Sequence, residues 1–279
     1  KFGVFPLKGK LLNVREATVK QQLENAEIKN LKKIIGLQKG KEYTEKNISE
    51  LRYRYIMIFT DQDNDGFHIK GLVMNWLHYE WPSLLQLDFI KSLATPIVRA
   101  KKRKVIKDFY NEPDYIKWCK KINTKSWHIK YYKGLGTSNS TEAKEYFTDL
   151  DKKLINYKWD TGIIDEINLT DKYIKLAFEK QQADNRKKWL ENKQDTSLDY
   201  NNKNINFSDF INEELKLFSY ADLERSIPNI VDGFKPSIRK ILYACFLRKL
   251  NTKKDEIKVS QLAGYVSDKT NYHHGENSL

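Results

Sequence analysis

The 279-residue sequence is long enough for one large domain or two ordinary ones, and its 40% hydrophobic and 13% aromatic content can bury a core. A formal charge of +13 at pH 7 favours a polyanionic partner, first of all double-stranded DNA, and no run of about 18 apolar residues suggests a membrane span. The two cysteines, Cys119 and Cys245, are too few and too far apart for a disulfide framework or a zinc site, and they indicate a reducing compartment.

The first fifty residues combine a basic loop with a helix. Lys8 and Lys10 follow a proline and precede a short apolar stretch, a pattern that suits either a loop approaching phosphate or a plain basic surface turn. Apolar residues recur at helical spacing from Ala17 to Leu37, and Gly36 is placed to end that helix. We expect residues 38–50 to form a loop that leads into the next strand.

The following stretch carries the strongest chemical signal. Tyr55 to Phe59 is apolar at every position, which predicts a strand buried on both faces of a mainly parallel sheet. Asp61, Asp63 and Asp65 follow at its C-terminal end, where open α/β sheets place their sites. Three clustered carboxylates repel one another unless a cation holds them, so we expect a site for Mg²⁺, with Mn²⁺ or Ca²⁺ as substitutes.

Other interpretations of the acidic motif exist. An EF-hand is excluded because the twelfth position of its loop would be Leu72, where a bidentate carboxylate is needed, and because a strand precedes the motif. A phosphotransferase with Asp61 as nucleophile and a polar turn closed by Gly66 both remain open.

A helix packed on the sheet is predicted after the motif. Its apolar stripe is formed by Ile69, Leu72, Val73, Trp76 and Leu77. His68 would open this helix, as a phosphate contact or as a capping or solvent-facing residue, and His78 is expected to be structural.

The middle of the chain alternates strand and helix patterns. The predicted elements are strands at 93–100, 104–110 and 127–133, and helices at 114–122, from about Ser140 through Phe147, and at 170–193. Lys133, Gly134 and Gly136 lie where a strand turns into a helix, which suits a phosphate cradle or a simple tight turn. Residues 195–206 are polar and predict a linker or disordered hinge.

The end of the chain predicts a helix-turn-helix. A helix begins at Pro236, which leaves Lys235, Arg239 and Lys240 near its N-terminal turns, where they suit a phosphate backbone. Its expected core side is Ile238, Ile241, Leu242 and Cys245. A second helix follows at 259–266, and a third is expected to begin at 272–276. His273, His274 and Glu276 could also ligate zinc, although the usual ligand spacing is missing.

Several of these segments together resemble one family, the type IIA DNA topoisomerases of the eukaryotic and large-virus branch. The resemblance is carried by Phe5 to Ala17, Thr60 to Gly71, Tyr131 to Thr137, Glu224 to Pro228, Val231 to Pro236, and Tyr272 to Glu276.

The resemblance implies an α/β Toprim domain followed by a mostly helical winged-helix domain. The implied boundaries are 1–150 for Toprim, 151–206 for a helical connector and linker, and 207–279 for the start of the winged helix. It also implies that Asp61 and Asp63 hold Mg²⁺ with support from Asp65, that an upstream glutamate lies before Lys1, and that His273 and His274 support cleavage and contact DNA.

The implied activity is ATP-dependent change of DNA topology through transient double-strand cleavage and a 5′-phosphotyrosyl intermediate. The resemblance places the tyrosine nucleophile beyond Leu279 and ATP on a domain outside this chain, and it implies a homodimer in the nucleus, or at a cytoplasmic replication site for a large DNA virus. Another Toprim-type nuclease or primase, or a non-catalytic basic DNA-binding module, is the alternative.

Overall fold

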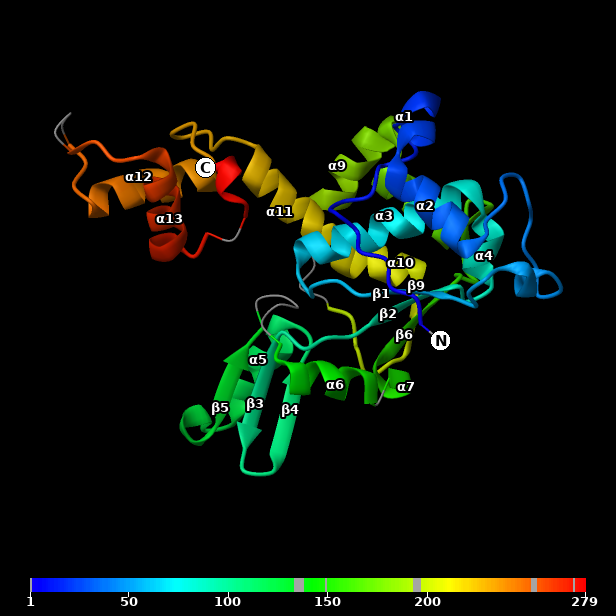
Figure 1. The fold of residues 1–279 in the computed structure, drawn as a ribbon, viewed down its shortest axis with the longest axis horizontal. Helices are drawn as coiled ribbons and strands as arrows, with labels where there is room; N and C mark the ends of the chain where they lie inside the picture. Colours follow the sequence, from blue (N-terminus) through cyan, green and yellow to red (C-terminus); the bar gives the residue numbers. More distant parts are fainter. Residues whose placement is uncertain (1, 133–137, 149, 193–196, 252–254, 273) are drawn as a thin grey trace. The chain divides into compact units, whose positions relative to one another are not determined.

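The computed structural model describes residues 2–132, 138–148, 150–192, 197–251, 255–272 and 274–279. The chain forms two compact units, residues 1–218 and 219–279, and the division falls within helix α11 (Lys216–Ser226) (Figure 1). The first unit therefore extends past the boundary expected near residue 206. It does so because Phe207, Phe210 and Ile211 are buried in its core. The division into functional domains stays a prediction.

The first unit is built on a four-stranded sheet. Its strands, in hydrogen-bonded order, are β1 (Ile56–Ile58), β2 (Ile90–Leu93), β6 (Leu154–Lys158) and β9 (Asn204–Asn206). β1 pairs with β2 and β6 with β9 in parallel, whereas β2 and β6 are antiparallel. The predicted α/β class is confirmed, with a mixed sheet. β1 lies at one edge of this order, so Ile56 and Met57 are half-buried rather than buried on both faces.

Helices cover this sheet. In the first unit they are α1 (Val19–Glu24), α2 (Ala26–Ile35), α3 (Asn64–Glu80), α4 (Pro82–Gln86), α5 (Glu112–Lys121), α6 (Ser140–Thr148), α7 (Leu150–Lys153), α8 (Leu169–Phe178), α9 (Ala183–Glu191) and α10 (Phe207–Phe210), with short 3₁₀ turns η1 (Ile48–Glu50), η2 (Thr124–Ser126) and η4 (Lys180–Gln182) and the π-helix η5 (Ile211–Leu215). Among the described residues, no helix combines the length and apolar content needed to cross a bilayer.

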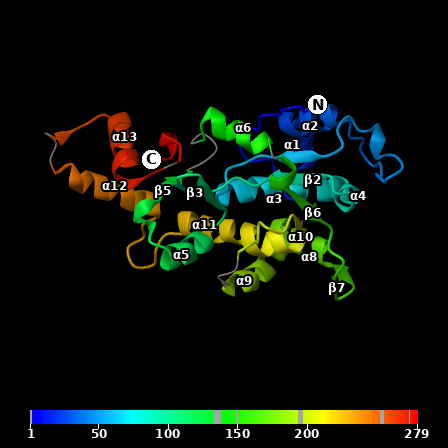
Figure 2. The same ribbon diagram turned by 90° about the horizontal axis from the view of Figure 1, so that it is seen from below.

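Helix α3 is the centre of the main core. Trp76 and Leu77 from the predicted apolar stripe are fully buried, and α8 and η5 pack along the helix (Figure 2). Gly71 allows that approach, because a Cβ there would lie 3.0 Å from side-chain atoms of both Leu215 and Phe178. Each large apolar side chain buried in this way stabilises the fold by about 1.5–3 kcal/mol.

A second, three-stranded antiparallel sheet carries its own small core. Its order is β4 (Val105–Phe109), β3 (Val98–Lys102) and β5 (His128–Tyr131). Helix α5 packs on it and adds Trp118 to a cluster with Val98, Ala100 and Phe109. The strands predicted on either side of a Lys-rich turn are thereby confirmed. A two-stranded ribbon, β7 (Ile163–Ile164) and β8 (Ile167–Asn168), completes the unit.

Two long helices predicted from periodicity are each divided in the structure. The segment 17–37 breaks at Asn25, whose side chain accepts the N–H of Ile28 and caps α2, and Gly36 ends α2 with a left-handed φ of 90°. Residues 170–193 likewise form α8, the turn η4 and α9. Apolar spacing continues across both breaks, so it did not reveal the capping side chain that restarts the backbone.

The prediction of a linker at 195–206 is wrong for the described residues 197–206. Leu198, Tyr200 and Ile205 are buried in the main core, and β9 extends the sheet by pairing with β6. The segment is polar in composition, but its few apolar side chains are placed to reach the core. Composition averages over the window and hides those positions.

The second unit contains α12 (Pro236–Leu247), α13 (Val259–Thr270) and the 3₁₀ turn η7 (Glu276–Ser278). Pro236 begins α12 as predicted, and Ala244, Val266 and Tyr272 form the buried centre of the unit. The predicted core residues Ile238 and Leu242 are 40% and 38% exposed, because α12 turns another side towards α13. The expected third helix is, in the described residues, the short turn η7.

A buried polar network ties the N-terminal segment to α3 and α8. Arg15 donates to Oδ1 of Asn75 at 2.7 Å, to Glu179 at 2.5 Å and to Nδ1 of His78 at 2.6 Å. The other ring nitrogen of His78 is 2.7 Å from Asp171. The ring must therefore be neutral, accepting at Nδ1 and donating from Nε2. Burial lowers the pKa of His78 to about 4, which confirms the structural role expected for it.

This network predicts an acid-sensitive fold. Because the pKa of His78 is about 4 in the folded chain and about 6.5 when unfolded, the unfolded state binds more protons between those values. Stability is then fully present above pH 6.5 and falls by up to about 3 kcal/mol as the pH approaches 4. Urea unfolding followed by tryptophan fluorescence measures it, since all six tryptophans lie in the first unit. His78→Gln should flatten the slope; an unchanged slope would contradict the assignment.

Candidate metal and DNA-binding site

The acidic loop joins β1 to α3. Asp63 is the N-cap of α3, and its Oδ1 accepts the backbone N–H of Gly66 at 2.7 Å. The chain folds back so tightly here that a Cβ at Gly66 would lie 1.9 Å from the backbone oxygen of Asp61. Glycine is therefore the residue that this turn requires, and the turn fixes the backbone that carries the acidic side chains.

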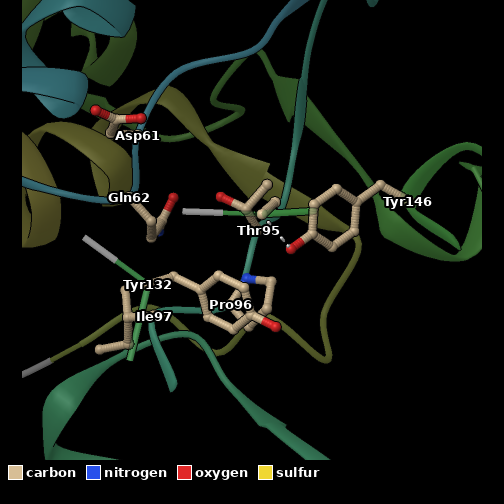
Figure 3. A pocket seen from close by; sticks show the side chains of 8 residues that line it. Asp61, Gln62, Thr95, Pro96, Ile97, Tyr132 and Tyr146 are labelled. Carbon is tan, nitrogen blue, oxygen red and sulfur yellow. Dashed lines mark hydrogen bonds between the residues drawn. The ribbon is translucent and has the colours of Figure 1, made fainter. Parts of the chain in front are cut away.

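Asp61 and Gln62 reach a small pocket between the two sheets of the first unit (Figure 3). The pocket is lined by Asp61, Gln62, Thr95, Pro96, Ile97, Tyr132, Ser138 and Tyr146. Ser138 and Tyr146 hydrogen-bond to each other through their hydroxyl groups at 3.0 Å. Figure 3 shows the Asp61 side chain lying apart from the rings of Tyr132 and Tyr146, so the lining is polar around the end of β1.

Asp65 faces the basic N-terminal loop. Its Oδ1 lies 2.8 Å from Nζ of Lys10, in an ion pair whose side chains are 32% and 41% exposed. Nζ of Lys10 also lies 4.7 Å above the ring of Phe218, on which His68 stacks at 3.8 Å. The backbone N–H of Lys8 donates to Glu27 at 2.9 Å. The loop that carries Lys8 and Lys10 is thus brought to the first turns of α3.

The position of His68 differs from the expectation that it opens the helix. Helix α3 begins at Asn64, one turn earlier, because Asp63 and not a later residue supplies the cap. The ring of His68 is accordingly held in the second turn by its stack on Phe218.

The three aspartates have different surroundings. Asp63 is exposed, Asp61 and Asp65 are half-buried, and no group of three or more His, Cys, Asp or Glu in the described residues is arranged to hold a metal ion. Mg²⁺ is commonly held by one or two carboxylates and completes its octahedron with water. Asp61 and Asp63, hard oxygen donors on one short loop, fit such an ion, whereas Asp65 is turned to Lys10.

A buried network that the sequence did not reveal lies directly behind the acidic loop. Lys70 of α3 and Glu214 of η5 are both buried, with Nζ and Oε2 3.8 Å apart. Nζ of Lys70 donates to Oε1 of Gln62 at 3.2 Å, Nε2 of Gln62 donates to Oε1 of Glu214 at 3.2 Å, and the hydroxyl of Tyr200 donates to the same Glu214 oxygen. Gln62 lies between Asp61 and Asp63, so the network fixes the loop from behind.

Burial controls the charges in this network. It lowers the pKa of Lys70, which the nearby Glu214 and Asp63 oppose, and it raises the pKa of Glu214, which Lys70 opposes. Glu214 sits in a π-helix, an element that often accompanies functional sites. The only signal in the sequence was a lysine between two apolar positions of the α3 stripe.

The glycine turn predicted to bind phosphate, Lys133, Gly134 and Gly136, lies outside the described residues. Its neighbour α6 is capped by Asn139, which exchanges hydrogen bonds of 2.9 Å with Glu142, so Ser140 is the first helical residue and not the cap we expected. Burial raises the pKa of Glu142, but hydrogen bonds from Lys130 and Tyr132 outweigh this effect and lower it to about 2.

In the second unit, the predicted DNA contacts are partly engaged within the protein. Arg239 pairs with Asp232 at 2.6 Å, and Nζ of Lys240 donates to the backbone oxygen of Thr270 at 2.9 Å. Lys235 is the half-buried N-cap residue of α12. The ring of His274 meets that of Tyr272 edge-on at 5.5 Å, and His273 lies outside the described residues.

Comparisons with known proteins agree along the chain. The C-terminal associated domain of TOPRIM matches residues 93–223, and the DNA gyrase/topoisomerase IV family matches residues 225–279. A probable DNA topoisomerase 2 of Dictyostelium discoideum is 52% identical over 283 residues, and human DNA topoisomerase 2-beta is 49% identical over 294 residues. Both alignments cover all of this chain and 18% of the relative.

A solved structure gives the same result. The fold is similar to the Plasmodium falciparum topoisomerase II DNA-binding, cleavage and re-ligation domain, with a TM-score of 0.83 and 45% identity over 98% of this chain and 36% of that one. The chain spans less than a fifth of the length of the curated relatives. The two adjoining family matches and the identity of about half along the whole chain show that it belongs to the type IIA DNA topoisomerase family.

Proposed function

We propose that this chain is part of the DNA-cleavage core of an ATP-dependent type II DNA topoisomerase. The observation that carries the proposal is the acidic loop, because Asp61 and Asp63 stand at the C-terminal end of β1 while Lys10 is held at the first turns of the helix that follows. Carboxylates for a metal ion and cations for a phosphate backbone are thus brought to one place. Family membership and the similarity to a cleavage and re-ligation domain support the same activity.

Each group has a distinct task in this proposal. A Mg²⁺ ion bound by Asp61 and Asp63, for which Mn²⁺ or Ca²⁺ can substitute, would stabilise negative charge on the reacting phosphate oxygens. Asp65 orients Lys10 through their ion pair, and Lys8 and Lys10 contact the DNA backbone. Lys133, Gly134 and Gly136 are proposed as a further phosphate contact, since their type and order suit one.

The second unit would contact the same duplex. Lys235, Arg239 and Lys240 lie in the first turns of α12, where helix N–H groups and positive charge favour phosphate. Arg239 would exchange its partner Asp232 for a DNA phosphate, which is a stronger acceptor of its two N–H groups. His273 and His274 are proposed to contact DNA and support cleavage. ATP binding by another part of the protein, a homodimer, and a nuclear or viral replication-site location complete the proposal.

A salt titration tests the DNA-binding half. Because 41 of the 50 basic residues are lysines, which act as point charges, we expect duplex binding with little sequence preference and a steep loss of affinity with salt. Each neutralised phosphate contributes about −0.9 to the slope of log affinity against log salt concentration. The measurement is fluorescence anisotropy of two labelled duplexes of unrelated sequence. A slope near zero, or strong preference for one duplex, would contradict phosphate contact.

A further inference from the structure

The positive charge of the chain is concentrated in one short region. Residues 98–131, which form β3, β4, α5 and β5, contain eleven Lys and Arg against three Asp and Glu. Their net charge of +8 compares with +13 for all 279 residues. This region lies outside the acidic loop and outside every DNA contact proposed above.

Most of these cations are not used by the fold. Arg99 pairs with Asp108 and Glu145, Lys130 pairs with Glu142, and Lys117 lies 3.9 Å from Asp114. The other eight are exposed and make no ion pair with a carboxylate in the part of the chain that the structure describes. They are Lys101, Lys102, Arg103, Lys104, Lys107, Lys120, Lys121 and Lys125.

The hairpin of β3 and β4 holds five of these cations in a defined frame. Its strands pair in register from Val98 with Phe109 to Lys102 with Val105, and only Arg103 and Lys104 connect them. Nζ of Lys102 lies 5.9 Å from the ring of Trp127, and Nζ of Lys107 lies 5.5 Å from that of Phe109. Aromatic rings thus support the lysine stems while the ammonium groups stay in water.

The turn of the hairpin gives an independent indication. Arg103 has a φ of 54°, in the left-handed region that costs a non-glycine residue about 1 kcal/mol, and two-residue hairpin turns favour Asn or Gly at such positions. A charged side chain therefore occupies the tip at some cost to the fold. Backbone strain of this kind is often found where a residue contacts a ligand.

We propose that this basic hairpin, defined as Val98–Phe109, binds the phosphate backbone of duplex DNA as a second surface, with Lys120, Lys121 and Lys125 at its side. A five-residue strand spans roughly 16 Å, which matches about five successive phosphates along one DNA strand. Lysine ammonium groups suit phosphates without reading bases. The inference rests on the proposed function, and it lengthens the DNA segment held beyond the acidic loop.

A pair of charge-matched variants tests the proposal. The hairpin variant carries Lys101→Gln, Lys102→Gln, Arg103→Asn and Lys104→Gln. The control carries Lys29→Gln, Lys33→Gln, Lys39→Gln and Lys46→Gln, which are also exposed, make no ion pair with a described carboxylate and lie on other elements of the same unit. Both variants lose four positive charges, so long-range attraction to DNA changes equally and any difference reports local contact.

The readout is duplex affinity of the 279-residue chain at several salt concentrations. We expect the hairpin variant to bind at least tenfold more weakly near 0.1 M salt, with a slope shallower by about 2 to 4, since each lost phosphate contact removes about 0.9. The control should stay within about threefold of the unaltered chain and keep its slope. Equal losses in both variants would overturn the inference while leaving the proposed DNA binding intact, and failure of the unaltered chain to bind would overturn both.

A second measurement needs no variant. Lysines are acetylated with and without duplex and quantified by mass spectrometry. Duplex should protect Lys101, Lys102 and Lys104 severalfold more than Lys29 and Lys33. Equal protection of the two sets would overturn the inference, as would equal protection of the hairpin by polyglutamate, which would indicate a general acidic partner.

Discussion

Replacing Asp63 with Asn in a complete enzyme that contains this segment should reduce Mg²⁺-dependent DNA cleavage by roughly two to four orders of magnitude. Metal stabilisation of developing charge contributes several kcal/mol, and about 1.4 kcal/mol corresponds to a factor of ten in rate. Asn is preferred to Ala because Oδ1 of Asp63 caps α3 through Gly66. An amide oxygen keeps that cap, whereas Ala would lose about 1 kcal/mol of stability and confuse the result.

Cleavage of supercoiled plasmid, stopped with detergent, measures the rate, and Mn²⁺ binding followed by electron paramagnetic resonance measures the site itself. Duplex affinity should change little, since binding depends on the basic surfaces. Asp114→Asn, which removes an exposed carboxylate from α5, is the matched control and should leave both readouts unchanged. Cleavage by Asp63→Asn at the unaltered rate would remove Asp63 from the metal site.

The acidic loop could be anticipated because its determinants are local. A short apolar run, a carboxylate that caps the next helix and a glycine that permits close approach all lie between Ile56 and Gly66. The same reasoning found α3, α5 and the β3–β4 hairpin, whose patterns are also continuous in sequence. It failed at Asn25, where one side-chain cap divides a helix that the apolar spacing would continue.

The features that sequence reasoning missed depend on contacts between distant segments. β9 joins the sheet through Ile205, although its own residues are mostly polar. The network behind the acidic loop brings Gln62 against Tyr200 and Glu214, which are 138 and 152 positions away. Nothing in the spacing of Lys70 tells whether it faces water or a carboxylate of another helix. That choice is made by the packing of η5 on α3.

This network leads to the second large effect. Lys70→Met should destabilise the first unit by about 3–5 kcal/mol, because it leaves the buried carboxylate of Glu214 without its cation. The double variant Lys70→Met with Glu214→Gln removes both charges and should lie within about 1–2 kcal/mol of the unaltered chain, since a buried ion pair gains little over neutral groups of similar volume. Urea unfolding monitored by tryptophan fluorescence gives both values.

The pH dependence of the single variant separates a charge effect from a packing effect. Burial raises the pKa of Glu214, and loss of Lys70 removes a group that opposes this shift. Between the pKa of the unfolded carboxyl group, near 4.3, and the higher folded value, the folded state then binds more protons, so stability is lost as the pH rises. The deficit of Lys70→Met relative to the unaltered chain should accordingly be smaller at pH 5 than at pH 8, and acid weakening through His78 cancels because both chains share it. A deficit that is the same at both pH values, or one that persists in the double variant, would mean that Lys70 fills space in the core and that its charge does not hold Gln62 and the acidic loop in place.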